Sequence, residues 1–213
     1  MGKDIKDICF IIQSRLDSKR LPGKMLKLID CSFIPNKNIY LSLYDEKLIK
    51  IGRKYPVNIF KRSKQSVSES KDPRTVSEWG WKLPHKYFIT INACTPLLTE
   101  STIIDFIKHY LNSPNKSLFA VHKKKNFYWD SKGNMITEYP GSLDSKLVNH
   151  TFEAAHCLYA GCKNDLSNNV YLGDFTLNYP ELYVVHEKET FDIDEPWQFP
   201  IAEILYNNKN QFL

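Results

Sequence analysis

The stretch that decides the fold is residues 9–24, CFIIQSRLDSKRLPGK. It begins with a short apolar run, typical of a strand buried on both faces of a parallel sheet. Four cations follow within ten residues: Arg15, Lys19, Arg20 and Lys24. A loop after such a strand lies at the carboxyl edge of the sheet, where open α/β folds bind ligands. Backbone N–H groups and several Lys and Arg side chains in one loop suit a polyphosphate. The alternative is a solvated basic turn.

Beyond this stretch, strand-like runs alternate with helical patterns. The expected strands are 38–43, 57–60, 87–92, 118–122, 154–160 and 182–186. Helices are expected between Asp45 and Pro56, over 75–81, between Thr99 and Pro114, and over 196–207, with a loop at 61–71 and a hairpin around 131–134. This alternation predicts an α/β fold with a mostly parallel, three-layer, Rossmann-like sheet.

Length and composition favour one folded domain spanning residues 1–213, with 42% apolar and 13% aromatic residues. The net charge of +5 agrees with an anionic small-molecule substrate and is too small to indicate nucleic acid. No apolar run approaches the roughly 20 residues of a membrane helix. The N-terminus lacks a secretory pattern, and the five cysteines show no C-x-x-C spacing. We therefore expect a cytoplasmic protein with reduced thiols.

Three motifs together resemble one enzyme family. Residues 15–24, RLDSKRLPGK, resemble the N-terminal signature of the sugar-activating cytidylyltransferases, which include the CMP-sialic acid (acylneuraminate) synthetases, the CMP-Kdo synthetases and spore-coat polysaccharide proteins. Residues 89–98, ITINACTPLL, stand where that family has a strand and a Gln-Pro-Thr-Ser-Pro-Leu type turn. Residues 191–195, FDIDE, are similar to its Asp-Ile-Asp motif. The motifs occur in the family order over nearly the whole chain, which is more specific than any one alone.

The resemblance implies a nucleotidyltransferase fold and a CTP site. In the family the N-terminal loop wraps the triphosphate, so Arg15, Lys19 and Lys24 are the implied catalytic groups. The implied nucleotide-binding set is Gln13, Ser14, Arg15, Ser18, Lys19, Lys24, Arg62 and Asn92. For Arg62 the alternative is an ordinary surface charge. Asn92 takes the position of a family glutamine, and its amide can pair with the edge of cytosine.

Two carboxylates and one histidine complete the candidate site. Asp192 and Asp194 are two residues apart, so on a strand end they point to the same side and can share Mg²⁺. The alternative for an isolated Asp-x-Asp is a turn or helix-cap pair. His156 lies in the apolar run 154–160, AAHCLYA, and is a candidate pocket residue, with a satisfied core histidine as the alternative.

The resulting hypothesis is Mg²⁺-dependent transfer of a cytidylyl group from CTP to the anomeric hydroxyl of an acidic sugar. A nonulosonic acid related to sialic acid, activated for surface polysaccharide, is the first choice, and Kdo or a phosphonate is the alternative acceptor. Other classes are a nucleotide-sugar glycosyltransferase or a non-catalytic nucleotide-binding homologue. The family commonly dimerises, and residues 127–151 are the implied dimerisation segment of a homodimer.

Three departures from the family pattern concern the N-terminal third. Asp17 stands where sialic acid synthetases usually have glycine, and Met25 replaces an asparagine that often follows the loop lysine. Residues 27–37 leave too little chain for the helix that the family has there. We expect either a lost helix or missing residues.

Overall fold

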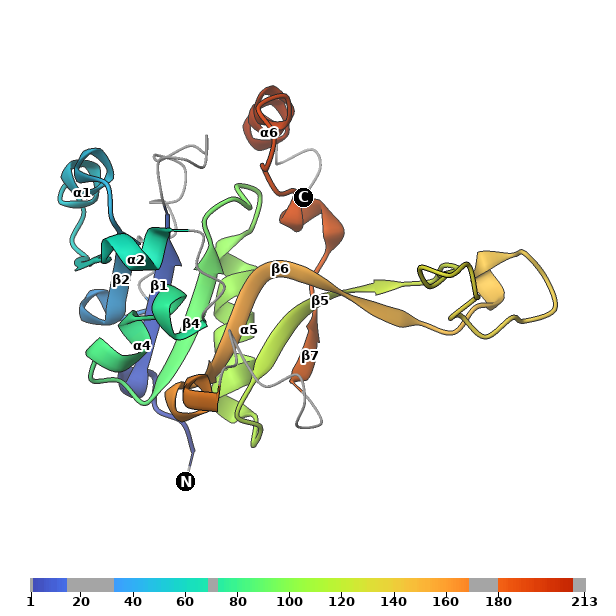
Figure 1. The fold of residues 1–213 in the computed structure, drawn as a ribbon, viewed down its shortest axis with the longest axis horizontal. Coiled ribbons are helices and arrows are strands. Elements are labelled where there is room, and N and C mark those ends of the chain that lie inside the picture. The colour runs from blue at the N-terminus through green and yellow to red at the C-terminus, as the bar shows by residue number, and fades with distance from the viewer. Residues whose placement is uncertain (1, 15–32, 69–72, 169–179, 209–213) are drawn as a thin grey trace.

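A computed structural model of the chain describes residues 2–14, 33–68, 73–168 and 180–208. Its centre is a seven-stranded sheet in the order β3-β2-β1-β4-β6-β5-β7 (Figure 1). The strands are β1 (Ile8–Gln13), β2 (Ile39–Leu43), β3 (Asn58–Lys61), β4 (Tyr87–Asn92), β5 (Leu118–Lys124), β6 (Thr151–Cys162) and β7 (Glu181–Val184). β6 is antiparallel to both neighbours, and the other pairs are parallel. The predicted mostly parallel α/β sheet is confirmed.

Helices cover both faces of this sheet. The α-helices are α1 (Glu46–Gly52), α2 (Lys64–Val67), α3 (Pro73–Val76), α4 (Trp79–Lys82), α5 (Glu100–Asn112) and α6 (Gln198–Asn207). Short 3₁₀ turns are η1 (Ile5–Asp7), η3 (Asn36–Asn38), η4 (Ser145–Leu147), η5 (Lys163–Asn168) and η6 (Glu187–Thr190). Among these described helices, none is long and apolar enough to span a membrane.

The alternation of β1 side chains produces the three layers. Phe10 and Ile12 belong to a core cluster completed by residues of α1 and α5. Cys9 and Ile11, on the opposite face, pack in a second cluster with Trp79 of α4. All four are buried, as expected of a strand covered on both sides.

The structure corrects some predicted boundaries. The stretch 61–71, predicted as a loop, contains the short helix α2, because the Ser63 hydroxyl accepts a hydrogen bond from the N–H of Ser66 (3.2 Å) and caps it. The helix predicted over 75–81 divides into α3 and α4. β6 extends beyond the predicted 154–160 at both ends, where its residues lack an apolar pattern.

The predicted helix between Thr99 and Pro114 is confirmed as α5. The Thr99 hydroxyl accepts from the N–H of Thr102 (3.2 Å), which caps the first turn. Glu189 of η6 lies at the same helix end and accepts from the Thr99 N–H and hydroxyl, both at 2.9 Å. A carboxylate at a helix N-terminus is stabilised by the helix dipole, so this contact fixes η6 against α5.

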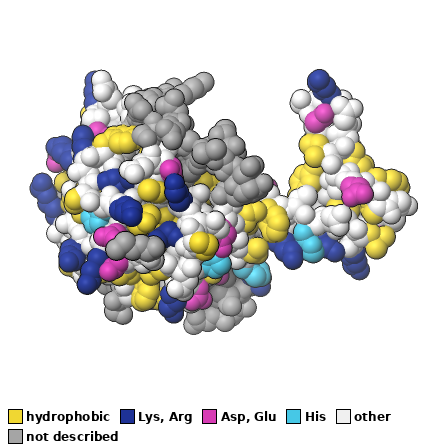
Figure 2. All heavy atoms as spheres, turned by 90° about the horizontal axis from the view of Figure 1, so that it is seen from below, with side chains coloured by type: hydrophobic (Ala, Val, Ile, Leu, Met, Phe, Trp, Pro, Cys, Tyr) yellow, Lys and Arg dark blue, Asp and Glu magenta, His cyan; other side chains and the backbone are white. Residues whose placement is uncertain are grey.

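β5 and β6 continue away from the main body as an arm (Figure 1). The arm contains the predicted turn, in which Gly133 has φ +84° and Trp129 pairs with Met135 in an isolated bridge. Hydrophobic side chains are exposed along the arm, and Figure 2 shows it as a separate lobe with yellow patches. They are Trp129, Met135, Ile136, Tyr139, Leu143, Leu147 and Phe152.

The edge strand β7 is held by the side chain of Glu181. Its carboxylate accepts hydrogen bonds from Asn115 (2.9 Å) and from the Ser113 hydroxyl, and lies 2.6 Å from His109 Nε2. Partial burial opposes its ionisation, but the hydrogen bonds from Ser113, Asn115 and His109 dominate and lower the pKa of Glu181 to about 2.

This shift predicts an acid-dependent loss of stability. Because the folded pKa lies below the ordinary 4.5, the ionised carboxylate stabilises the fold above about pH 4.5, and that contribution disappears as the pH falls toward 2. At pH 7, Glu181→Gln should lower the free energy of unfolding by at most about 3 kcal/mol, and Tm should fall accordingly. The deficit should shrink as thermal melts are repeated from pH 5 down to pH 2. The control is Glu203→Gln, on exposed α6, and a constant deficit for Glu181→Gln would contradict the assignment.

Candidate functional site

The parallel strands β1, β2, β3 and β4 end at one edge of the sheet, and several predicted site residues gather there. Gln13 at the end of β1 is the register partner of Asn92 at the end of β4. Ser14 follows Gln13 and donates its N–H to the carbonyl of Ser42 in β2 (3.2 Å). Arg62 comes directly after β3. The structure thus brings four predicted nucleotide-binding residues to the edge where open α/β sheets bind ligands.

Several residues singled out in the sequence follow Ser14 and lie outside the described residues. They are Arg15, Ser18, Lys19 and Lys24, together with Asp17, Met25 and most of 27–37. Their predicted contacts with a triphosphate therefore stay predictions.

Arg62 is buried, with 5% of its surface exposed. Its Nε donates to the Ser66 hydroxyl (3.0 Å), and the guanidinium also donates to the Ser66 carbonyl. With the Gln13 amide turned so that its oxygen faces Arg62, that oxygen accepts from both terminal nitrogens, at 2.9 and 3.1 Å. The planar fork of arginine suits this geometry. The alternative of an ordinary surface charge is wrong, and Arg62 positions Gln13.

A second charged group fixes the backbone beside Arg62. Glu78 accepts from the N–H of Ser63 at 2.5 Å and from the Lys82 ammonium at 2.8 Å. Burial opposes ionisation, but the contacts with Lys82 and Ser63 outweigh it and lower the pKa of Glu78. The segment that follows β3 is therefore tied to α4 through an ionised carboxylate.

Asn92 joins β4 to β6. Its amide nitrogen donates to the carbonyl of His156 (2.8 Å), and its amide oxygen accepts from the N–H of Cys94 (2.9 Å). The Asn92 carbonyl also accepts from the Thr95 hydroxyl (3.2 Å). These contacts define the turn after β4. They use one N–H and one lone pair of the Asn92 amide, and its predicted pairing with cytosine stays a prediction.

His156 lies in a bulge of β6. The register between β5 and β6 shifts between the pairs Phe119–Tyr159 and Val121–Ala154. At this point His156 has φ +52°, and among the described residues no other non-glycine has a positive φ. Its side chain is exposed, so the alternative of a core histidine is wrong. Nδ1 lies 2.5 Å from the hydroxyl of Tyr159.

Asp192 and Asp194 lie between η6 and α6, outside any strand, so the expected strand end is wrong. Ile193 between them is buried and donates its N–H to the carbonyl of Cys94 (3.1 Å), after β4. This contact places the acidic pair beside the turn that follows Asn92. Asp192 is half-buried and Asp194 is exposed. Both supply the hard carboxylate oxygens that Mg²⁺ prefers, so the residues fit the expected ion.

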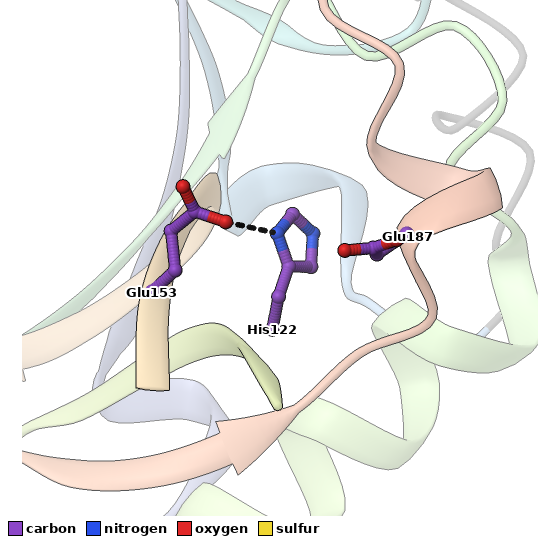
Figure 3. Close-up of side chains that lie close together, drawn as sticks. All are labelled: His122, Glu153 and Glu187. Carbon is purple, nitrogen blue, oxygen red and sulfur yellow. Dashed lines mark ion pairs between the residues drawn. The ribbon is translucent and has the colours of Figure 1, made fainter. Parts of the chain in front are cut away.

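A further cluster of titratable groups consists of His122, Glu153 and Glu187 (Figure 3). No sequence pattern indicates it, because the three residues come from β5, β6 and η6. One ligand-type atom of each lies within 4.8 Å of the others. His122 Nδ1 is 3.7 Å from Glu153, and Nε2 is 2.6 Å from the Thr190 hydroxyl.

A lysine already neutralises part of the charge of this cluster. Lys124 pairs with Glu187 and lies 3.5 Å from Glu153. Burial, followed by Lys124, lowers the pKa of His122. A metal ion would have to displace the ammonium, so we interpret the cluster as an ion-pair network at the base of the arm.

Comparison with known proteins identifies the fold. The sequence matches no protein-family model and no curated protein. Among solved structures, the chain is similar to a CMP:2-keto-3-deoxy-manno-octonic acid synthetase complexed with CTP (12% identity, TM-score 0.64, covering 97% of this chain and 99% of that one).

Two further solved structures have the same fold. One is the 4-diphosphocytidyl-2C-methyl-D-erythritol synthase from Anaerococcus prevotii (18% identity, TM-score 0.66, covering 96% and 100%). The other is a cytidylyltransferase from Leptospira borgpetersenii (13% identity, TM-score 0.55, covering 96% and 95%). At these identities the likeness shows the fold, and it extends over nearly the full length of each chain.

Proposed function

From this fold and this sheet edge, we propose that the chain is a CTP-dependent cytidylyltransferase. The observation that carries the proposal is the position of Gln13, Ser14, Arg62 and Asn92 on adjoining strand ends, at the point where the cationic stretch 15–24 begins. The strand order 3-2-1-4 makes β1 the switch point of the parallel sheet, the usual place of a nucleotide in such folds. A solved structure with this fold is a complex with CTP, which supports CTP as the nucleotide.

The proposed reaction is an in-line attack by an acceptor hydroxyl on the α-phosphorus of CTP, with pyrophosphate as the leaving group. Such transfers depend on positioning and charge neutralisation more than on covalent chemistry. Arg15, Lys19 and Lys24 hold the triphosphate and neutralise the departing pyrophosphate, and the Ser18 hydroxyl donates to a phosphate oxygen. Buried Arg62 fixes Gln13 at the nucleotide side of the edge.

The acceptor in this proposal is an acidic sugar. A nonulosonic acid related to sialic acid is the first candidate, following the sequence resemblance. Kdo is supported by the likeness to the 2-keto-3-deoxy-manno-octonic acid synthetase structure. A phosphonate remains an alternative acceptor for the same chemistry.

Pyrophosphate release tests the proposed reaction. With Mg²⁺ and CTP, the protein should release pyrophosphate in the presence of one member of a panel containing sialic acids, Kdo and a phosphonate, and ATP, GTP and UTP should not replace CTP. Lys19→Ala should lower kcat/KM at least about tenfold, because one phosphate-neutralising charge is lost. The control is Lys132→Ala, in the exposed turn of the arm. No release with any acceptor would contradict the proposal, and UDP-sugar turnover would favour a glycosyltransferase.

We also propose that Asp192 and Asp194 hold Mg²⁺. Two carboxylates leave the other positions of an octahedral ion to water and phosphate oxygens, as is usual for this metal. The bound ion would polarise the phosphorus and lower the pKa of the attacking hydroxyl.

The metal proposal predicts that Asp194→Asn removes most Mg²⁺-dependent activity, because one hard anionic ligand becomes a neutral amide. The measurement is initial rate against Mg²⁺ concentration, in parallel with EDTA treatment of the wild type. Asp105→Asn, an exposed carboxylate on α5, is the matched control. An unchanged rate and metal dependence in Asp194→Asn would assign the pair a structural role.

The exposed side chains of the arm support the predicted homodimer. Leu143 and Ile136 are 77% and 68% exposed, and Trp129, Tyr139 and Leu147 are each more than half exposed. Clusters of large exposed apolar side chains usually mark interaction surfaces. An isologous contact between two copies would cover each arm with the same elements of the other.

Leu143→Glu combined with Ile136→Glu should therefore convert a dimer into a monomer, because dimer formation would now bury two carboxylates of each copy and remove them from water. Light scattering coupled to size-exclusion chromatography measures the mass directly. Ile201→Glu on α6, also exposed, is the control for a non-specific effect of added charge. A wild-type monomer, or a variant that stays dimeric, would contradict this role of the arm.

A further inference from the structure

Beyond Asn92 the sheet edge continues to strands that carry none of the predicted nucleotide-binding residues. The strand order places β6 beside β4 on the side opposite β1. Gln13 and Arg62 lie on the β1 side of Asn92, and His156 lies on the β6 side. The acidic pair follows η6, which contacts β6, and Ile193 between the two carboxylates bonds to the carbonyl of Cys94 directly after β4. If the nucleotide occupies the β1 side, the β6 side is left for the acceptor.

The backbone of His156 adopts a left-handed conformation that is unfavourable for a histidine. A φ of +52° brings the Cβ of an L-residue close to its own backbone, and glycine or asparagine would be the less costly choice. Strained residues persist where the surroundings over-determine them, and they concentrate at functional sites. Here the surroundings are the β6 bulge and the Asn92 amide, which bonds to the His156 carbonyl. Those contacts stabilise the strained backbone of His156, but they do not involve its imidazole ring.

The imidazole itself is oriented by a buried partner. The Tyr159 hydroxyl lies 2.5 Å from Nδ1, and the Tyr159 ring packs edge-on against Phe119. When the hydroxyl donates to Nδ1, the ring proton resides on Nε2, and protonation of the ring also leaves a donor there. Among the described residues Nε2 has no hydrogen-bonding partner. With the Tyr159 hydroxyl as donor, the arrangement presents an N–H donor at Nε2 on an exposed ring beside Asn92.

We propose that His156 binds the acceptor through a hydrogen bond from Nε2 to an anionic oxygen of that molecule, a carboxylate or a phosphate oxygen. This inference rests on the proposed cytidylyltransferase function and identifies a specificity residue on its acceptor side. A hydrogen bond to an ionised oxygen is shorter and stronger than one to a neutral oxygen. Tyr159 acts as a positioning residue that keeps the ring in place.

The test uses two substitutions that remove the ring without disturbing the backbone. Glycine and asparagine both tolerate a positive φ, so His156→Gly and His156→Asn should keep or raise Tm. Both should raise the acceptor KM at least about tenfold while the KM for CTP stays within about twofold, because only the acceptor loses a hydrogen bond. Tyr159→Phe should raise the acceptor KM less. His85→Asn, before the start of β4 at the opposite edge, is the control.

Two acceptors distinguish the source of the oxyanion: Kdo supplies a carboxylate, and 2-C-methyl-D-erythritol 4-phosphate supplies a phosphate. A KM effect confined to one of them assigns the group that His156 contacts. An unchanged acceptor KM in both ring-free variants of an active enzyme would overturn the inference. If the wild type shows no turnover, the proposed function is contradicted and the inference about His156 is tested separately. The test is then the imidazole ¹⁵N spectrum of the protein with each acceptor added. A shifted Nε2 signal supports it, and an unshifted signal overturns it.

Discussion

The direction of β6 is the constraint on which the candidate site depends. An antiparallel strand between β4 and β5 must enter the sheet at the edge where the parallel strands end. The connection from β5 therefore projects as an arm from that edge, and the first residues of β6 in the body line it. His156 and its bond to Asn92 follow from this geometry, because β6 passes the end of β4 at that point. One reversed strand thus links the arm, the bulge and the sheet edge.

Burial of Arg62 adds a second constraint at the other end of the edge. A buried charge is costly unless its hydrogen-bonding capacity is met, and here Ser66 and Gln13 meet much of it. Because the guanidinium is fixed by α2 and by the end of β1, the spacing between those two elements is also fixed. Burial of this charge thus gives a defined position to Gln13 at the end of β1.

Periodicity in the sequence is sufficient to predict the fold, because local patterns of apolar and capping residues indicate where the strands and helices lie. The apolar run of β1, the strand 87–92 and the Thr99 cap each express a rule that acts within a few residues. The polar contacts of the site are different. Asn92 bonds to a residue 64 positions away, and Glu189 bonds to one 90 positions away. No periodic pattern encodes such pairs. His156 was visible only as a histidine in an apolar run, because its positive φ arises from the bulge.

The acidic pair shows how a site outside regular structure can still be held in place. η6, which precedes Asp192, has three side-chain anchors on two elements, β5 and α5. Glu187 pairs with Lys124 of β5, Glu189 caps α5, and Thr190 bonds to His122. The bond from Ile193 to Cys94 then fixes the segment after the turn. Because Lys124 and His122 lie at the base of the arm, any contact that moves the arm would act on the same anchors that position the two carboxylates.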